Sequence, residues 1–123
     1  VYKRQTLGDA LLAVHTSYLH SLHPLIADGL LDGLSHITGG GIVGNTSRIL
    51  REGLTLDIDW RSWAVPPIFD VIQREGNVTE AEMRHVFNLG VGMICIVHES
   101  RAEEVLQRLA NDKPFYVGRV ISS

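Results

Sequence analysis

Three consecutive glycines occupy the centre of the stretch His36-Ile-Thr-Gly-Gly-Gly-Ile-Val-Gly-Asn-Thr-Ser-Arg48. Residues 35–38 predict a short strand, and residues 42–51 predict a helix that ends near Gly53. Glycine tolerates backbone conformations that other residues avoid, so the run suits a tight turn from strand to helix. A strand, a glycine turn and a helix in succession indicate a fold in which helices pack on a sheet.

Strands and helices continue to alternate on both sides of the glycine run. Leu54, Leu56 and Ile58 alternate with polar residues, which is typical of a half-buried strand. Thr79 and Ser100 each begin a capping box, a pattern that marks the start of a helix. Further strands are predicted at residues 14–20, 54–59, 91–98 and 115–121, and further helices at residues 24–31, 66–76, 79–87 and 100–109. The alternation predicts a layered domain of the α/β or α+β class.

The composition is that of one globular domain. The chain has 123 residues, 45% of them hydrophobic, and a net charge of −3. No apolar run is long enough to span a membrane, and the acidic balance argues against a nucleic-acid partner. Cys95 is the lone cysteine and lies in an apolar run, which favours a reducing cytoplasm. The chain begins with Val1-Tyr-Lys-Arg4 rather than Met, so we expect a processed or truncated N-terminus.

The glycine run is also typical of a phosphate-binding turn. Glycines let the backbone approach an anion closely, and the N-terminus of the following helix adds free N–H groups and partial positive charge. Thr38 can donate a hydroxyl hydrogen bond there, and Arg48 lies about two helical turns further along. No lysine-containing Walker motif is present, so backbone amides and arginine would bind the anion. The alternative is a tight turn that binds no ligand.

A dinucleotide site is a second interpretation of the same glycines. Gly39, Gly41 and Gly44 satisfy the G-x-G-x-x-G fingerprint, and Asp59 ends the next strand, where a ribose-binding acid would lie. The strand before the glycines is short and polar, whereas a central parallel strand is usually continuous in Val, Ile and Leu. This strand therefore argues against the dinucleotide hypothesis.

Several histidines and aspartates invite a metal-site hypothesis. The spacing His15-x4-His20-x2-His23 resembles a zinc pattern, but on the predicted strand His20 points away from His15. Asp57 and Asp59 share one strand face, which is more simply a solvated face than a cation site. We therefore predict no metal site in this chain. His36 immediately precedes the glycines and is a candidate for proton transfer.

A second glycine segment, Phe87-Asn-Leu-Gly-Val-Gly-Met93, completes a set of spaced motifs. Together with the glycine run, Trp63 to Phe69, Gly76-Asn-Val78 and Glu82-Met83, it resembles the C-terminal domain of the phosphoribosylformylglycinamidine cyclo-ligase (AIR synthetase) family. The resemblance spans nearly the whole chain, from Leu7 to Gly118. It implies an α+β fold, a layered α/β sandwich with a mixed sheet, as one domain over residues 1–123.

The resemblance also implies a function. Enzymes of that family have two domains, usually form homodimers, and use ATP and Mg²⁺ to convert formylglycinamidine ribonucleotide to aminoimidazole ribonucleotide in purine biosynthesis. An N-terminal domain, expected to lie outside this chain, would supply most ATP and metal contacts, and the fragment alone would be inactive. The site residues implied are His36 as the catalytic residue, with Thr38, Gly39, Gly40, Gly41, Asn45, Arg48 and Asn88 binding substrate or phosphate.

The chain departs from the family's pattern in two places, of which the lesser is Ser47, where the family usually has Pro before the helix arginine. The family commonly has Pro-Thr-Arg-x-Tyr-x-Lys after the leading leucines, where this chain has Val14-His-Thr-Ser-Tyr-Leu-His20, so only Tyr18 matches. That difference leaves room for a related ATP-dependent enzyme of the same superfamily with a different substrate. The remaining alternative is a phosphate-binding module without catalysis.

Overall fold

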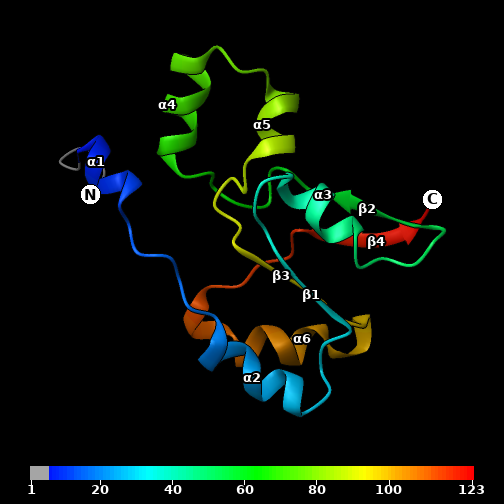
Figure 1. Cartoon of the computed structure of the whole chain (residues 1–123). Helices are drawn as coiled ribbons and strands as arrows, with labels where there is room; N and C mark the ends of the chain where they lie inside the picture. The colour runs from blue at the N-terminus through cyan, green and yellow to red at the C-terminus, as the bar shows by residue number, and fades with distance from the viewer. Residues whose placement is uncertain (1–5) are drawn as a thin grey trace.

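The computed structural model describes residues 6–123, and the expectation about the first four residues lies outside that range. In the order of the sequence, the elements are α1 (Leu7–Leu11), α2 (Leu19–Ala27), β1 (Gly33–His36), α3 (Gly41–Ser47), β2 (Leu54–Ile58), α4 (Pro67–Gly76), α5 (Glu80–Val86), β3 (Met93–Ile96), α6 (Glu99–Arg108), the 3₁₀ turn η2 (Ala110–Asp112) and β4 (Gly118–Ser122) (Figure 1). Short strands are interspersed among the helices, so the predicted α+β class is confirmed.

The strands form two antiparallel pairs. In the first, β1 pairs with β3, and Leu34 lies opposite Cys95. In the second, β2 pairs with β4, and Leu56 lies opposite Val120. Within residues 6–123 no strand pairs in parallel, so the single mixed sheet that we expected is wrong. A parallel neighbour of β1 would need a crossover helix returning to the same sheet, whereas α3 leads from β1 to β2 in the other pair.

One hydrophobic cluster joins α2 to α6 beside the first strand pair (Figure 1). Its buried side chains are Leu22, Leu25, Leu30, Val105 and Leu109. Two arginines of α6 also form ion pairs with aspartates that follow α2. Arg101 donates to Asp32 and to the Gly29 carbonyl at 2.8 and 2.7 Å, and Arg108 donates to Asp28 at 2.7 Å. These polar contacts are exposed, so the apolar cluster carries most of the stability here.

A second hydrophobic cluster lies under the glycine run. Ile37 and Ile42, which flank the glycines, pack with Val91 and Ile94, and Trp60 and Trp63 cover them. Ile42 is fully buried. The run therefore joins two anchored residues, and its position is fixed on both sides by packing.

Two predicted element boundaries are wrong near the ends of the first cluster. Residues 14–20 do not form a strand, because helix α2 begins at Leu19 and contains Pro24 in its interior. Proline lacks an N–H donor, but burial of Leu22 and Leu25 against α6 outweighs that cost. The N-cap of α6 is His98, two residues before the predicted cap Ser100, since His98 accepts the Ser100 N–H at 3.2 Å.

The remaining boundaries match the predictions more closely. Thr79 caps α5 by accepting the Glu82 N–H at 3.2 Å, as its capping pattern predicts. Strand β2 and helix α4 lie where alternation and the two prolines placed them. Helix α3 is shorter than predicted and ends at Ser47. Helix α1, which the sequence analysis missed, begins with a capping box of Thr6 and Asp9. No helix within residues 6–123 has the length and apolarity needed to cross a membrane.

Candidate functional site

The glycine run connects β1 to α3 through backbone conformations that favour glycine. Gly40 caps the helix with φ of 113°, and Gly41 begins it with φ of 69°. Both values lie in the left-handed region, where a side chain strains the backbone. The turn that the sequence predicts between strand and helix is therefore present, and two of its glycines are required by backbone conformation alone.

The side chain of Asn45 forms hydrogen bonds to both ends of this turn. Its side-chain amide donates to the Gly41 carbonyl at 2.8 Å and to the Thr38 carbonyl at 3.2 Å, and its oxygen accepts the Thr38 hydroxyl at 3.2 Å. Asn45 is buried, so these bonds replace solvent for a polar side chain. Thr38 and Asn45, both predicted to bind phosphate, are brought together and bond to each other. Asn45 thus has a visible structural role whatever the ligand.

The three glycines have different neighbours. A Cβ on Gly41 would collide with the Arg84 carbonyl oxygen on α5, so that glycine lets α3 pack against α5. A Cβ on Gly40 would lie 3.5 Å from the Asn45 amide nitrogen and 3.9 Å from the Arg48 guanidinium. A Cβ on Gly39 would meet nothing within 4 Å. Gly39 is exposed, and its missing side chain is explained neither by packing nor by a positive φ.

The second glycine segment lies against the first. The Ile37 N–H donates to the Gly92 carbonyl at 3.0 Å. Asn88, which is predicted to bind substrate, makes a turn-forming bond, because its side-chain oxygen accepts the Gly90 N–H at 2.9 Å. Gly90 leaves room for Pro66, and Gly92 leaves room for the Tyr18 ring and hydroxyl. Packing accounts for the glycines of this segment.

His36 is exposed at the end of β1 and contacts a residue that the sequence analysis did not connect with it. Its Nε2 atom lies 3.3 Å from Nε2 of His15, and the ring centroids are 5.2 Å apart. The Nδ1–H of His15 donates to the Thr16 carbonyl at 2.8 Å. The two histidines are 21 residues apart, and His15 lies in a segment predicted to be a strand, so no sequence pattern pointed to the pair.

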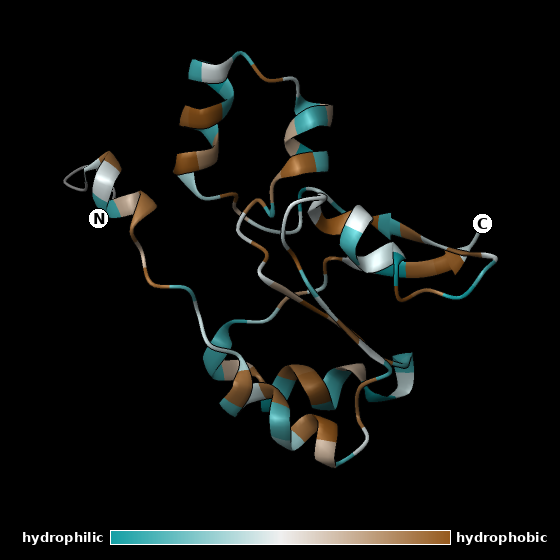
Figure 2. Cartoon of the chain, viewed as in Figure 1, coloured by the Kyte–Doolittle hydropathy of each residue, from teal (hydrophilic) through white to brown (hydrophobic). Residues whose placement is uncertain are grey.

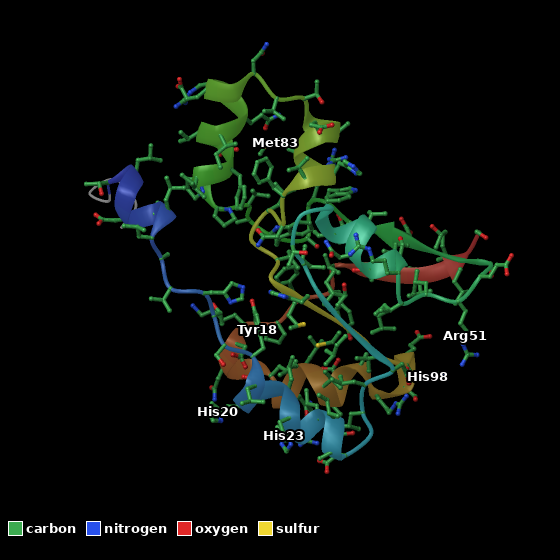
Figure 3. The ribbon with its side chains drawn as sticks, in the orientation of Figure 1. Tyr18, His20, His23, Arg51, Met83 and His98 are labelled. Carbon is green, nitrogen blue, oxygen red and sulfur yellow. The ribbon has the colours of Figure 1, made fainter. Side chains whose placement is uncertain are left out.

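His20 and His23 do not join this pair. Both lie on α2, where Figure 3 shows them at the outer side of the helix, away from the glycine run. The zinc pattern that the spacing of the three histidines suggested is therefore not assembled. Among residues 6–123, no cluster of three or more His, Cys, Asp or Glu side chains could hold a metal ion.

The comparisons with known proteins agree with this arrangement of motifs. A model of the family described as "AIR synthase related protein, C-terminal domain" matches residues 2–123. The chain belongs to this family. It is 44% identical over 117 residues to a phosphoribosylformylglycinamidine cyclo-ligase of Bifidobacterium animalis subsp. lactis (strain AD011), and the match covers 94% of the chain and 34% of that relative.

Two further relatives carry the same name. The protein of Bifidobacterium longum (strain DJO10A) is 41% identical over 114 residues, covering 92% of this chain and 33% of the relative. The protein of Burkholderia mallei (strain SAVP1) is 40% identical over 121 residues, covering 97% and 34%. The chain thus spans about a third of the length of the curated relatives that it matches.

The topology of this AIR synthase related domain contradicts the dinucleotide hypothesis. That site needs a parallel unit in which the strand before the glycines and the strand after the helix are neighbours. Here β1 and β2 belong to different antiparallel pairs. The space beside Gly41, the middle glycine of the fingerprint, is filled by the backbone of α5. Asp59 accepts the Arg61 N–H at 3.0 Å in a turn.

Two other features of the chain have structural explanations. Burial raises the pKa of the Cys95 thiol, which keeps it protonated and unreactive, as its apolar surroundings predict. A cavity of about 170 Å³ between α4 and α5 is lined by Trp60, Trp63 and Phe69 among others. The Arg84 guanidinium lies 4.5 Å from the centre of the Trp60 ring, and it pairs with Glu80 at 2.6 Å. This cleft was not predicted from the sequence.

Proposed function

We propose that this chain is the C-terminal domain of a phosphoribosylformylglycinamidine cyclo-ligase that acts in purine biosynthesis. The observation that carries the proposal is the 40–44% identity to proteins of that name over nearly the whole chain. In the proposed reaction, a phosphoryl group of ATP is transferred to the amide oxygen of formylglycinamidine ribonucleotide. An internal nitrogen then displaces inorganic phosphate and closes the imidazole ring. Such chemistry depends mainly on positioning and charge stabilisation.

The exposed face of the glycine run supports a phosphate-binding role within that reaction. Gly39 has open space where a side chain would be, so a phosphate oxygen can approach the backbone there. Arg48 is exposed and its guanidinium lies near Gly40, which places positive charge beside the same turn. Thr38 is exposed and can exchange its bond to Asn45 for one to a ligand. We assign substrate phosphate to this face and proton transfer to His36.

ATP and Mg²⁺ belong to the proposed N-terminal domain of the same protein. Mg²⁺ prefers several oxygen ligands, and residues 6–123 gather no cluster of carboxylates that would supply them. The role left to this chain is to bind and orient the nucleotide substrate. Apart from the proton transfer assigned to His36, no chemical step is assigned to it.

Exposed apolar side chains support a partner domain. Leu7 and Leu11 on α1, and the following Leu12 and Val14, are exposed, the last two by 83% and 94%. Figure 2 shows this apolar arm standing apart from the rest of the chain. Exposed apolar groups in such number indicate an interface. We propose that the N-terminal domain covers the arm, in a cytoplasmic enzyme that forms a homodimer.

The proposal is tested by joining this chain to an N-terminal ATP-binding domain in one polypeptide and measuring aminoimidazole ribonucleotide formation. Turnover should require ATP, Mg²⁺ and both domains, and His36→Ala should lower kcat while the melting temperature stays unchanged. Turnover by the 123 residues alone would overturn the proposal that a separate N-terminal domain binds ATP and Mg²⁺. Binding of the nucleotide without any turnover by the joined protein would instead favour a non-catalytic module.

A matched pair of glycine variants tests the phosphate-binding face. In the joined protein, Gly39→Ala adds a methyl group into open space where phosphate is proposed to bind, so KM for the nucleotide should rise about tenfold or more. Gly44→Ala adds the same group on α3, also into open space, and should leave KM unchanged. Equal KM values for the two variants would remove Gly39 from the substrate site.

A further inference from the structure

The contact between His15 and His36 has the geometry of a metal-binding pair. Both side chains are exposed, and their Nε2 atoms face each other at 3.3 Å with the ring planes at 82°. Nitrogen atoms of this kind are the ligands that zinc, nickel and copper ions prefer in proteins. The question is whether the two rings are placed as hydrogen-bonding partners or as ligands of one ion.

Two distances distinguish these possibilities. Imidazoles bound through Nε2 to one tetrahedral ion, with metal–nitrogen bonds of about 2.05 Å, have nitrogens about 3.3 Å apart and ring centres about 5.2 Å apart. A straight N–H···N hydrogen bond at the same nitrogen separation would place the ring centres about 5.6 Å apart. The structure has 3.3 Å and 5.2 Å. The two rings are therefore not in line, and both distances equal those expected for ligands of one ion.

The outer hydrogen bond of His15 also suits a ligand. A carbonyl can only accept, so the 2.8 Å contact with Thr16 means that Nδ1 of His15 carries the proton. In the neutral ring, Nε2 then carries the lone pair, and this atom lies 3.3 Å from Nε2 of His36. A backbone carbonyl on the second nitrogen is a common support for metal-bound histidine, because it fixes both the tautomer and the ring orientation.

We propose that His15 and His36 form a two-histidine site for a divalent transition-metal ion of the zinc class. Two protein ligands leave the remaining positions to water or to an oxygen of a bound ligand. The site differs from the Mg²⁺ requirement of the proposed reaction, because imidazole pairs select borderline ions over Mg²⁺. It does not rest on the proposed function, since it needs only these two side chains. It revises our prediction that the chain holds no metal site.

Titration of the 123-residue chain with ZnCl₂, followed by calorimetry, tests the proposal directly. We expect one ion per chain with a Kd on the order of 1–100 µM, weaker than a four-ligand structural site because half the ligands are missing. MgCl₂ under the same conditions should give no saturable binding. His15→Ala and His36→Ala should each weaken zinc binding by at least about tenfold, since even the loss of an outer-shell partner has that effect.

The chain provides its own matched controls. His20→Ala and His23→Ala remove exposed histidines at the outer side of α2, and each should leave the zinc Kd unchanged. Thermal melts of all four variants show whether the fold is intact, which is expected because the four side chains are exposed. If the wild-type chain did not bind zinc, the proposal would be overturned and the two histidines would be only a hydrogen-bonded pair. An unchanged Kd in His15→Ala, or a loss in His20→Ala as large as in His15→Ala, would overturn it as well.

Discussion

The two ends of the glycine run differ in what surrounds them. Gly41 is buried against the backbone of α5, with a positive φ, and no side chain fits there. Gly39, two residues earlier, is exposed, and a side chain there would meet nothing within 4 Å. The same residue type therefore serves the fold at one end of the run and remains unexplained by the fold at the other. That second case is the one that indicates a ligand.

The largest effect that follows from this comparison is at the buried end. Gly41→Ala should destabilise the chain by about 2–5 kcal/mol, because the methyl group forces α3 from α5 and the left-handed backbone conformation disfavours alanine. Urea unfolding monitored by tryptophan fluorescence measures the change. A loss below about 1 kcal/mol would mean that α3 and α5 separate at little cost, and the contrast with Gly39 would disappear.

Asn45 offers the next largest effect, because it ties the two ends of the run together. Asn45→Ala removes the hydrogen bonds to the Thr38 and Gly41 carbonyls. It should lower the free energy of unfolding by about 1–3 kcal/mol, since the carbonyl of the buried residue Gly41 loses this donor. Equilibrium unfolding in urea gives the value. Asn45→Asp is the matched control: it keeps the size and one acceptor but loses both donated bonds, so it should be no more stable than the alanine variant. Wild-type stability in either variant would show that the Asn45 hydrogen bonds do not stabilise the turn.

The sequence predicted the glycine turn and the cap of α5 well, because the information is local. Three glycines before a helical pattern can hardly be anything but a turn, and Thr79 caps α5 as its spacing predicts. What it could not provide were contacts made at long range. That Gly41 serves α5 depends on residues 84 and 85, and that His36 meets His15 depends on a segment of irregular backbone.

The failed prediction at residues 14–20 shows the same limit from another side. Pro24 predicts the start of a helix, because proline suits a first helical position. The helix instead begins at Leu19, and burial of Leu22 and Leu25 against α6 decides its extent. Tertiary packing overrides the local signal, and α6 begins 72 residues after α2 ends.

A smaller effect is expected in the helix that follows the run. Thr46 is fully buried on α3, and its hydroxyl has no hydrogen-bond partner within residues 6–123. Thr46→Val replaces the hydroxyl with a methyl group of similar size and should stabilise the chain by about 1 kcal/mol. The urea midpoint should rise with an unchanged slope. A fall in stability would show that the hydroxyl is satisfied in solution, for example by a bound water.

The smallest effect is expected at the exposed end of the run, and it completes the comparison. Gly39→Ala should change stability by less than about 0.5 kcal/mol, because its methyl group would contact only solvent and its φ is not in the left-handed region. The same urea unfolding measurement applies, with Gly41→Ala as the reference. A loss approaching that of Gly41→Ala would mean that the fold itself requires both glycines. Stability close to that of the wild type, together with a raised KM in the joined protein, would mean that ligand binding, and not folding, requires a glycine at position 39. Nothing else in the described chain lies where the methyl group would be added.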